Sequence, residues 1–229
     1  MLILAFETSA KAGSVALMRS SKLLGEYYQN TGLTHSQTLL SMAEELLRSC
    51  GLTPKDVEAV AVAAGPGSFT GVRIGVAAAK GFSWGAQIPC YGVSTLEAMA
   101  YNAGTDGYVL PVMDARRSQV YTALFEGTER KMEDSAIALE ELKEKLRGLG
   151  KILLVGDGAQ LCYRTLSAEI PELVLAPEHR QHQRAAGVAL AAEAAIARGE
   201  SGDGAAVTPN YLRLSQAERE RLEKEKREA

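Results

Sequence analysis

The sequence predicts an α/β protein in which mixed β-sheets are flanked by helices. Short apolar runs, typical of buried strands, alternate with amphipathic or alanine-rich segments, typical of helices. The first three runs are separated only by short polar turns, which predicts an antiparallel meander at the start of a mixed sheet. The order of strands, helix, strand, helix and strand recurs in the second half, without visible repetition of residues. We therefore expect two subdomains of duplicated topology, at residues 1–104 and 105–215, followed by a charged tail at 216–229.

The composition is that of an ordinary globular chain. It has 229 residues, 46% of them hydrophobic and 23% charged, and a net charge of −3, which gives no overall reason to bind nucleic acid or a membrane. The three cysteines include no C-x-x-C pair, so neither a disulfide framework nor a zinc site is indicated. The N-terminal apolar run stops at Glu7, which is too short for a signal peptide core. We expect a cytoplasmic location and no membrane span.

The elements are bounded by recognisable signals. A capping-box pattern at 34–37 starts a strongly periodic helix that ends at Gly51, and a second one at 94–97 starts a short helix. The expected strands are 2–6, 13–18, 22–29, 57–64, 88–93, 108–113, 118–125, 151–155 and 173–175. The other expected helices are 72–85, 139–149, 159–167 and 185–197.

A glycine-rich stretch links one strand to the helix expected at 72–85. It reads GPGSFTGVRIG from Gly65 to Gly75, and either Ser68 or Thr70 can cap the helix. Such a turn can present free backbone N–H groups to an anion, or it can simply pack a helix closely onto a sheet. The spacing matches neither the dinucleotide-binding nor the Walker fingerprint, so both interpretations stay open.

The first two long helices predict an exposed apolar patch. The first carries an apolar arc too wide for one sheet-facing stripe, and the second has small residues that permit close approach of another helix. Exposed apolar patches mark interfaces, although another element of the same chain could also cover this one. The patch residues are Leu39, Leu40, Met42, Ala43, Leu46, Leu47, Gly71, Gly75, Ala78 and Ala79.

The string at 65–75 resembles the signature of the TsaB family, the dimerisation subunits of the bacterial complex that makes threonylcarbamoyladenosine in tRNA. Supporting segments follow in the right order along nearly the whole chain: Glu7–Ser9, Asp114–Arg117, Gly156–Ala159 and Pro209–Arg213. The resemblance implies the fold of the actin, sugar kinase and Hsp70 superfamily, with a nucleotide cleft between the subdomains. The implied cleft residues are Glu7, Thr8, Ser9, Asp114, Gly156, Asp157 and Gly158.

The resemblance also implies partners. They are the catalytic relative TsaD in a heterodimer, the ATPase TsaE in the larger complex, a second copy of this chain in isolation, and tRNA reached mainly through the complex. No motif requires a cofactor, and a nucleotide is the ligand that the cleft could hold. On this interpretation, Leu46→Glu would leave the fold intact and abolish TsaD binding through the patch.

The residues argue for an assisting rather than a catalytic subunit. TsaD carries two metal-ligand histidines four apart on a helix, and the matching positions here are Thr95 and Met99. A hydroxyl is a poor ligand and a thioether is too soft for such a site. The counterpart of a further aspartate ligand lies near Ala185, where no carboxylate is found. We expect no catalytic residue and no metal.

An enzyme of the same superfamily is the alternative. A small-molecule kinase would need carboxylates for magnesium, and Glu7, Asp114 and Asp157 are formally available. The short connections and the small second half argue against a full adenosine pocket. A glycopeptidase activity would follow from likeness to TsaD alone, and the missing histidines argue against it.

Overall fold

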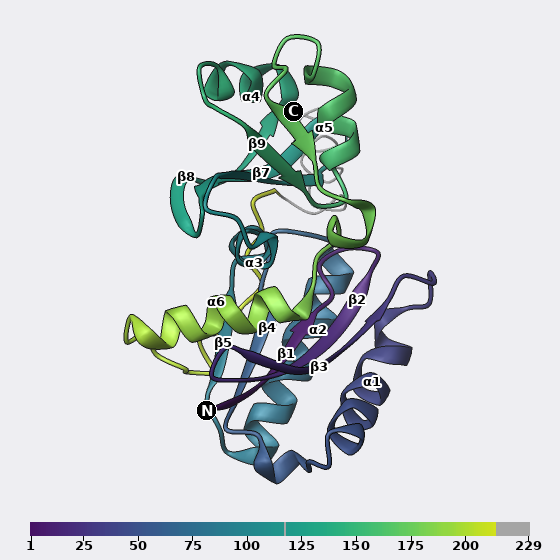
Figure 1. Ribbon diagram of the computed structural model, residues 1–229. Coiled ribbons are helices and arrows are strands. Elements are labelled where there is room, and N and C mark those ends of the chain that lie inside the picture. Colours follow the sequence, from purple (N-terminus) through teal and green to yellow (C-terminus); the bar gives the residue numbers. More distant parts are fainter. Residues whose placement is uncertain (117, 214–229) are drawn as a thin grey trace, which may run out of the picture.

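The computed structural model describes residues 1–116 and 118–213, which form two five-stranded sheets flanked by helices (Figure 1). The strand orders are β3-β2-β1-β4-β5 and β10-β9-β6-β7-β8. In each sheet, three antiparallel strands are continued by two parallel ones. The predicted α/β class and the duplicated topology are therefore confirmed. The predicted tail at 216–229 lies outside the described residues. No helix in the described ranges is long and apolar enough to cross a membrane.

The strands of the first sheet are β1 (Leu2–Glu7), β2 (Gly13–Arg19), β3 (Lys22–Gln29), β4 (Ala59–Ala63) and β5 (Cys90–Val93). Those of the second are β6 (Tyr108–Asp114), β7 (Gln119–Glu126), β8 (Glu129–Ala138), β9 (Ile152–Val155) and β10 (Leu173–Leu175). The helices are α1 (His35–Ser49), α2 (Phe69–Ala86), α3 (Thr95–Ala103), α4 (Leu139–Leu146), α5 (Ala159–Leu166) and α6 (Ala185–Ala197), with short 3-10 turns η1 (Pro54–Asp56) and η2 (Glu178–Arg180).

The alternation of side chains along β1 divides the first core into two layers. Leu2, Leu4 and Phe6 pack toward α1 and α2, whereas Ile3 and Ala5 pack toward α6. Because both faces are covered, β1 and β4 are buried along their whole length, which explains their continuous apolar runs. The second sheet packs one face against α4 and α5 and the other against α3.

Helices α3 and α6 lie between the two sheets (Figure 1). The chain returns to the first sheet after β10, and α6 is buried against it. The Glu26 carboxylate of β3 anchors the start of α6, because it accepts the Ala186 N–H at 3.1 Å and pairs with Arg184 at 2.6 Å. The prediction that 105–215 forms one C-terminal subdomain is therefore wrong beyond β10. An alanine-rich helix that is apolar all round does not indicate which sheet it joins.

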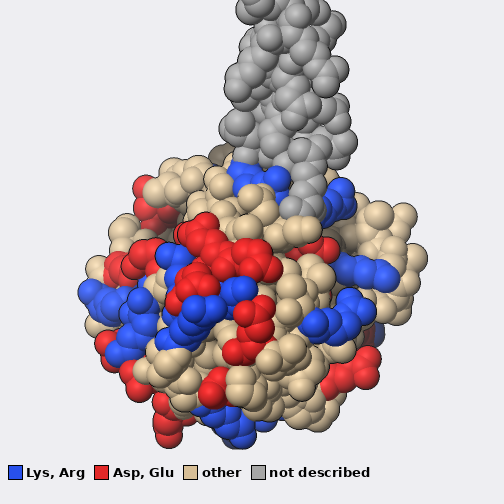
Figure 2. All heavy atoms as spheres, turned by 90° about the horizontal axis from the view of Figure 1, so that it is seen from above, with Lys and Arg blue, Asp and Glu red and all other residues tan. Residues whose placement is uncertain are grey.

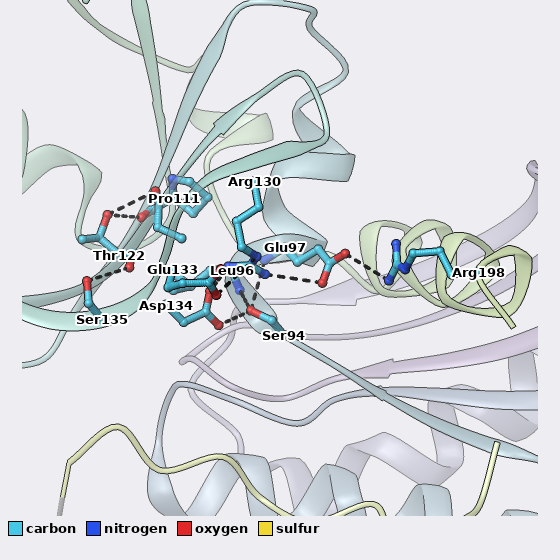
Figure 3. Close-up of polar contacts among 11 residues, drawn as sticks. Ser94, Leu96, Glu97, Pro111, Thr122, Arg130, Glu133, Asp134, Ser135 and Arg198 are labelled. Carbon is cyan, nitrogen blue, oxygen red and sulfur yellow. Dashed lines mark hydrogen bonds and ion pairs between the residues drawn. The ribbon is translucent and has the colours of Figure 1, made fainter. Parts of the chain in front are cut away.

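A polar cluster ties the start of α3 to the second sheet and to α6 (Figure 3). Ser94 caps α3 and also donates its hydroxyl hydrogen to Asp134 of β8. Arg130 of β8 pairs with Asp134 and, at 3.5 Å, with Glu97 of α3. Arg198, at the end of α6, pairs with Glu97 at 3.6 Å. The cluster helps to fix α3 between the two subdomains.

Three local predictions need correction. Strand β8 was not predicted, because its residues are mostly polar and only partly buried. Helix α2 begins at Phe69 rather than at residue 72, with Ser68 as the N-cap whose Oγ accepts the Gly71 N–H at 3.3 Å. Thr34 makes no side-chain capping hydrogen bond, so the capping box predicted for α1 does not form.

Candidate functional site

A cleft of about 630 Å³ lies between the ends of the two sheets. Of the predicted cleft residues, Ser9, Asp114 and Asp157 line it. Ser9 follows β1, Asp114 ends β6 and Asp157 follows β9, so equivalent strand ends from both sheets meet here. The crevice outside the carboxyl ends of strands is the usual ligand position in α/β folds.

Glu7 and Thr8 lie behind the cleft wall rather than on it. Glu7 is 1% exposed, its Oε1 accepts the Ser9 N–H at 2.5 Å, and its Oε2 has no hydrogen-bond partner among the described residues. Burial raises the pKa of Glu7 from 4.5 to about 7, against the lowering effect of the hydrogen bonds from Ser9. Thr8 donates its hydroxyl hydrogen to Gly71 O at 2.8 Å and so holds α2 against β1. Glu7 is therefore not a fixed negative charge near neutral pH.

Asp157 is accessible to solvent, but the cleft walls exclude much of the water around it. This desolvation raises the pKa of Asp157, the hydrogen bond from Gln183 Nε2 at 2.9 Å lowers it, and the nearby charge of Asp114 raises it. The charge of Asp114 thus disfavours the ionisation of Asp157.

Gly156 and Gly158 do not line the cleft, and their predicted place in it is wrong. A Cβ on Gly156 would lie 2.2 Å from Val112 O, and one on Gly158 would lie 2.9 Å from the Asp114 nitrogen. Gly156 also has a φ of +101°. These glycines let the turn after β9 cross close to β6.

One wall of the cleft was not predicted from the residues. Residues 210–213 run from the first subdomain to the second along the cleft. Tyr211 stacks on Phe69 of α2 with ring centroids 4.7 Å apart, and Arg213 donates an Nη1 hydrogen to Ala115 O at 2.6 Å. Only the family resemblance singled out this segment, because its contacts are distant in sequence.

Most residues of the predicted apolar patch are buried inside the chain and are therefore not available to a partner. Seven of its residues are buried inside the chain: Leu39, Ala43, Leu46, Leu47, Gly71, Gly75 and Ala79. A Cβ on Gly71 would lie 2.1 Å from Thr8 O, so the small residue admits the Thr8 turn rather than a partner helix. The prediction that these seven form an exposed surface is wrong. Leu40 is 59% exposed, and Met42 and Ala78 are half-buried.

An apolar stripe remains on the outer side of α2. It consists of Ile74, Ala77, Ala78, Gly81 and Trp84, which the helical period places along one side. Trp84 is 81% exposed, and a Cβ on Gly81 would meet nothing within 4 Å. We call these five residues the α2 stripe. Helical spacing within α2 was the sequence signal that could have identified it.

The two α3 positions that match the TsaD histidines face the protein interior. Thr95 is fully buried, and its Oγ1 has no hydrogen-bond partner among the described residues. Met99 packs in the apolar cluster between α3 and the second sheet. Within residues 1–116 and 118–213, no group of three or more His, Cys, Asp or Glu side chains could hold a metal ion.

Comparison with known proteins places the chain in a family. The family model described as TsaD, tRNA N6-adenosine threonylcarbamoyltransferase, matches residues 29–221. The tRNA threonylcarbamoyladenosine biosynthesis protein TsaB of Bacillus subtilis is 34% identical, over 99% of this chain and 100% of the relative. The Escherichia coli protein of the same name is 37% identical, over 70% of this chain and 73% of the relative.

Solved structures agree on the fold. YeaZ from Pseudomonas aeruginosa is 27% identical with a TM-score of 0.73, over 92% of this chain and 100% of that chain. The activator of 2-hydroxyisocaproyl-CoA dehydratase from Clostridium difficile shares the fold alone, at 11% identity and a TM-score of 0.55, over 87% of this chain and 97% of that chain. The fold is that of the actin-like ATPases and sugar kinases. With a relative more than 30% identical over its full length, the chain belongs to the TsaB family of tRNA threonylcarbamoyladenosine biosynthesis proteins.

Proposed function

We propose that this chain is a noncatalytic subunit that pairs with TsaD for threonylcarbamoylation of the tRNA adenosine next to the anticodon. The observation that carries the proposal is the α2 stripe. Ala77, Gly81 and Trp84 of the stripe are exposed, whereas Ile74 and Ala78 are half-buried. Exposed apolar residues that adjoin one another mark protein interfaces, and tryptophan is a frequent binding hot spot. The small residues Ala77, Ala78 and Gly81 would let a partner helix approach closely.

The charged residues near the α2 stripe indicate which kind of partner surface would fit it. Helix α2 contains Arg73 and Lys80 but no acidic residue. A partner helix with an apolar centre and acidic edges would therefore complement it. Leu40 on the neighbouring α1 would extend the contact. In isolation, a second copy of this chain would occupy the same face.

The noncatalytic role rests on the residues at the positions that match the TsaD ligands. Thr95, Met99 and Ala185 are all buried, and Met99 and Ala185 pack in apolar clusters. Catalysis is therefore assigned to TsaD, with the ATPase TsaE in the larger complex. The three cysteines are free, which fits a reducing cytoplasm.

We assign tRNA contact mainly to the complex. The net charge of this chain is −3. Figure 2 shows Lys and Arg interspersed with Asp and Glu on the visible end of the second subdomain, where α4 carries several ion pairs. Interspersed charges give a weaker attraction for phosphates than a continuous basic face would.

Ala77→Glu tests the pairing. Ala77 is exposed, so the carboxylate costs the isolated chain little, but at the interface it would lose its water and face the acidic edges proposed for the partner helix. We expect TsaD affinity, measured by titration, to fall by about 100-fold, which corresponds to about 3 kcal/mol.

The matched control is Ala197→Glu, an exposed alanine at the end of α6, on the opposite face of the first sheet. It should change TsaD affinity by no more than about twofold. Unchanged affinity of Ala77→Glu would contradict the proposed interface, provided that its unfolding midpoint equals that of the parent.

A nucleotide-dependent small-molecule kinase is a second candidate, favoured by the cleft itself. Its volume suits a small ligand, and Asp114 and Asp157 could hold magnesium. Calorimetry with ATP and magnesium, together with a turnover assay on the isolated chain, separates the two functions. Binding with turnover would support the kinase, whereas binding without turnover would leave the nucleotide as a ligand of a noncatalytic subunit.

A further inference from the structure

Arg73 lies at the N-terminal end of the exposed side of α2. It precedes Ala77 by one turn and Gly81 by two, so helical spacing places these residues and Trp84 along the same side of the helix. The side chains of Arg73 and Ala77 are both exposed. A partner helix that lies on the α2 stripe would therefore meet the Arg73 side chain at one end of the contact.

Two aromatic rings fix the plane of the Arg73 guanidinium. Its Cζ lies 3.7 Å from the centroid of the Phe69 ring and 5.6 Å from that of the Tyr211 ring. The two rings stack on each other with their centroids 4.7 Å apart, and the Arg73 Nε hydrogen is donated to the Tyr211 hydroxyl oxygen at 2.6 Å. A guanidinium held in this way has already lost part of the rotamer freedom that binding would otherwise remove.

The Arg73 guanidinium keeps its two terminal nitrogens available for a further contact. Among the residues that the structure describes, Tyr211 accepts the Nε hydrogen and nothing accepts from Nη1 or Nη2. Lys80, the other basic residue of α2, differs, because it is half-buried and its Nζ donates to Ala205 O at 3.2 Å and to Val207 O at 3.0 Å. Of the two cations of α2, Arg73 is therefore the one that a partner can reach.

We propose that Arg73 is a specificity-determining residue of the interface, whose Nη1 and Nη2 groups bind one carboxylate of the TsaD helix that covers the α2 stripe. A guanidinium presents two parallel donors that match the two oxygens of a carboxylate. Phe69 shields one face of the guanidinium from water, which makes the pair stronger than a fully exposed one. The inference rests on the proposed function and adds the chemistry of one contact to it.

Isothermal titration calorimetry with purified TsaD, in the absence of nucleotide and tRNA, tests the contact. Arg73→Lys keeps the charge but removes the parallel donors and the stacked plane, so it should lower the affinity by about tenfold. Arg73→Ala should lower it by about 30-fold, because the carboxylate of the partner then loses its water without gaining a donor. Both variants should keep the unfolding midpoint of the parent, since Arg73 is exposed.

Arg164→Ala is the matched control, because it removes an exposed arginine from α5 in the second subdomain. It changes the net charge by the same amount as Arg73→Ala, and it should change TsaD affinity by no more than about twofold. Tyr211→Phe keeps the stacked ring but removes the acceptor of the Arg73 Nε hydrogen. It should weaken TsaD binding by about threefold, since the guanidinium is then less well fixed.

Parent-like affinity of Arg73→Lys would overturn the proposal, because charge alone would then be sufficient. Parent-like affinity of Arg73→Ala would exclude any contact of this side chain with TsaD. A loss of affinity that appears only after ATP or tRNA is added would assign the guanidinium to a phosphate and would also contradict the proposal. Ala77→Glu reports separately on the proposed function: if it loses affinity while the Arg73 variants do not, the interface stands and the carboxylate contact fails.

Discussion

Leu46→Glu is expected to lower the free energy of unfolding by about 4 kcal/mol or more, enough to unfold much of the chain. Leu46 is 2% exposed and lies in the first core, where its Cδ1 is 2.8 Å from the position that a Cβ on Gly25 would take. Glutamate has a similar size, but its carboxyl group would have to be buried without a partner. The expectation that this variant keeps its fold is therefore wrong.

Urea denaturation followed by circular dichroism measures the effect. Leu40→Glu is the control, because Leu40 lies on the same helix but is 59% exposed. It should change the free energy of unfolding by no more than about 0.5 kcal/mol. A parent-like unfolding midpoint for Leu46→Glu would contradict the packing of α1 described here. Loss of TsaD binding by Leu46→Glu would be uninformative about the interface, since unfolding alone would produce it.

Glu7→Gln is expected to stabilise the protein by about 3 kcal/mol at pH 8 and by far less at pH 5. The folded-state pKa of Glu7 is about 7, above the ordinary value of 4.5, because burial disfavours the charged form. The folded state therefore binds the proton more tightly than the unfolded state. The ionisation of Glu7 costs stability progressively as the pH rises from 4.5 to 7, and the whole cost is present above pH 7.

Thermal or urea unfolding of both proteins across this pH range measures the difference. Glutamine keeps an oxygen for the Ser9 N–H and removes the buried charge. Glu44→Gln, which removes a charge from the exposed side of α1, should give a difference below about 0.5 kcal/mol at every pH. A stabilisation by Glu7→Gln that does not depend on pH would contradict the account of this buried carboxyl group.

The strands and helices with strong apolar periodicity could be predicted from the sequence, and so could the duplicated topology. Strand β8 could not, because it is a partly exposed edge strand without regular apolar alternation. The return of α6 to the first sheet depends on contacts far apart in sequence, such as those of Glu26 with Arg184 and Ala186. Local patterns carry no information about such pairings.

The candidate site could also be predicted only in part from local sequence patterns. The family resemblance implied a cleft at the ends of β1, β6 and β9, and of the seven implied residues Ser9, Asp114 and Asp157 line one. Whether each of them faces the cleft or the interior depends on the packing of the turn. Glu7 is buried behind Ser9, and Gly156 lies against β6. Burial likewise separates the exposed Leu40 from the buried Leu46 on α1, a distinction that helix periodicity alone left open.

Reconstituted threonylcarbamoyl transfer to tRNA is the most direct test of the proposed noncatalytic role. The assay would supply threonylcarbamoyl-adenylate, ATP and tRNA to this chain alone, to TsaD with TsaE, and to all three proteins together. The account predicts no modification by this chain alone and full activity only when all three are present. It also predicts that Ala77→Glu, but not Ala197→Glu, loses the stimulation. Modification of tRNA by this chain alone would contradict the account.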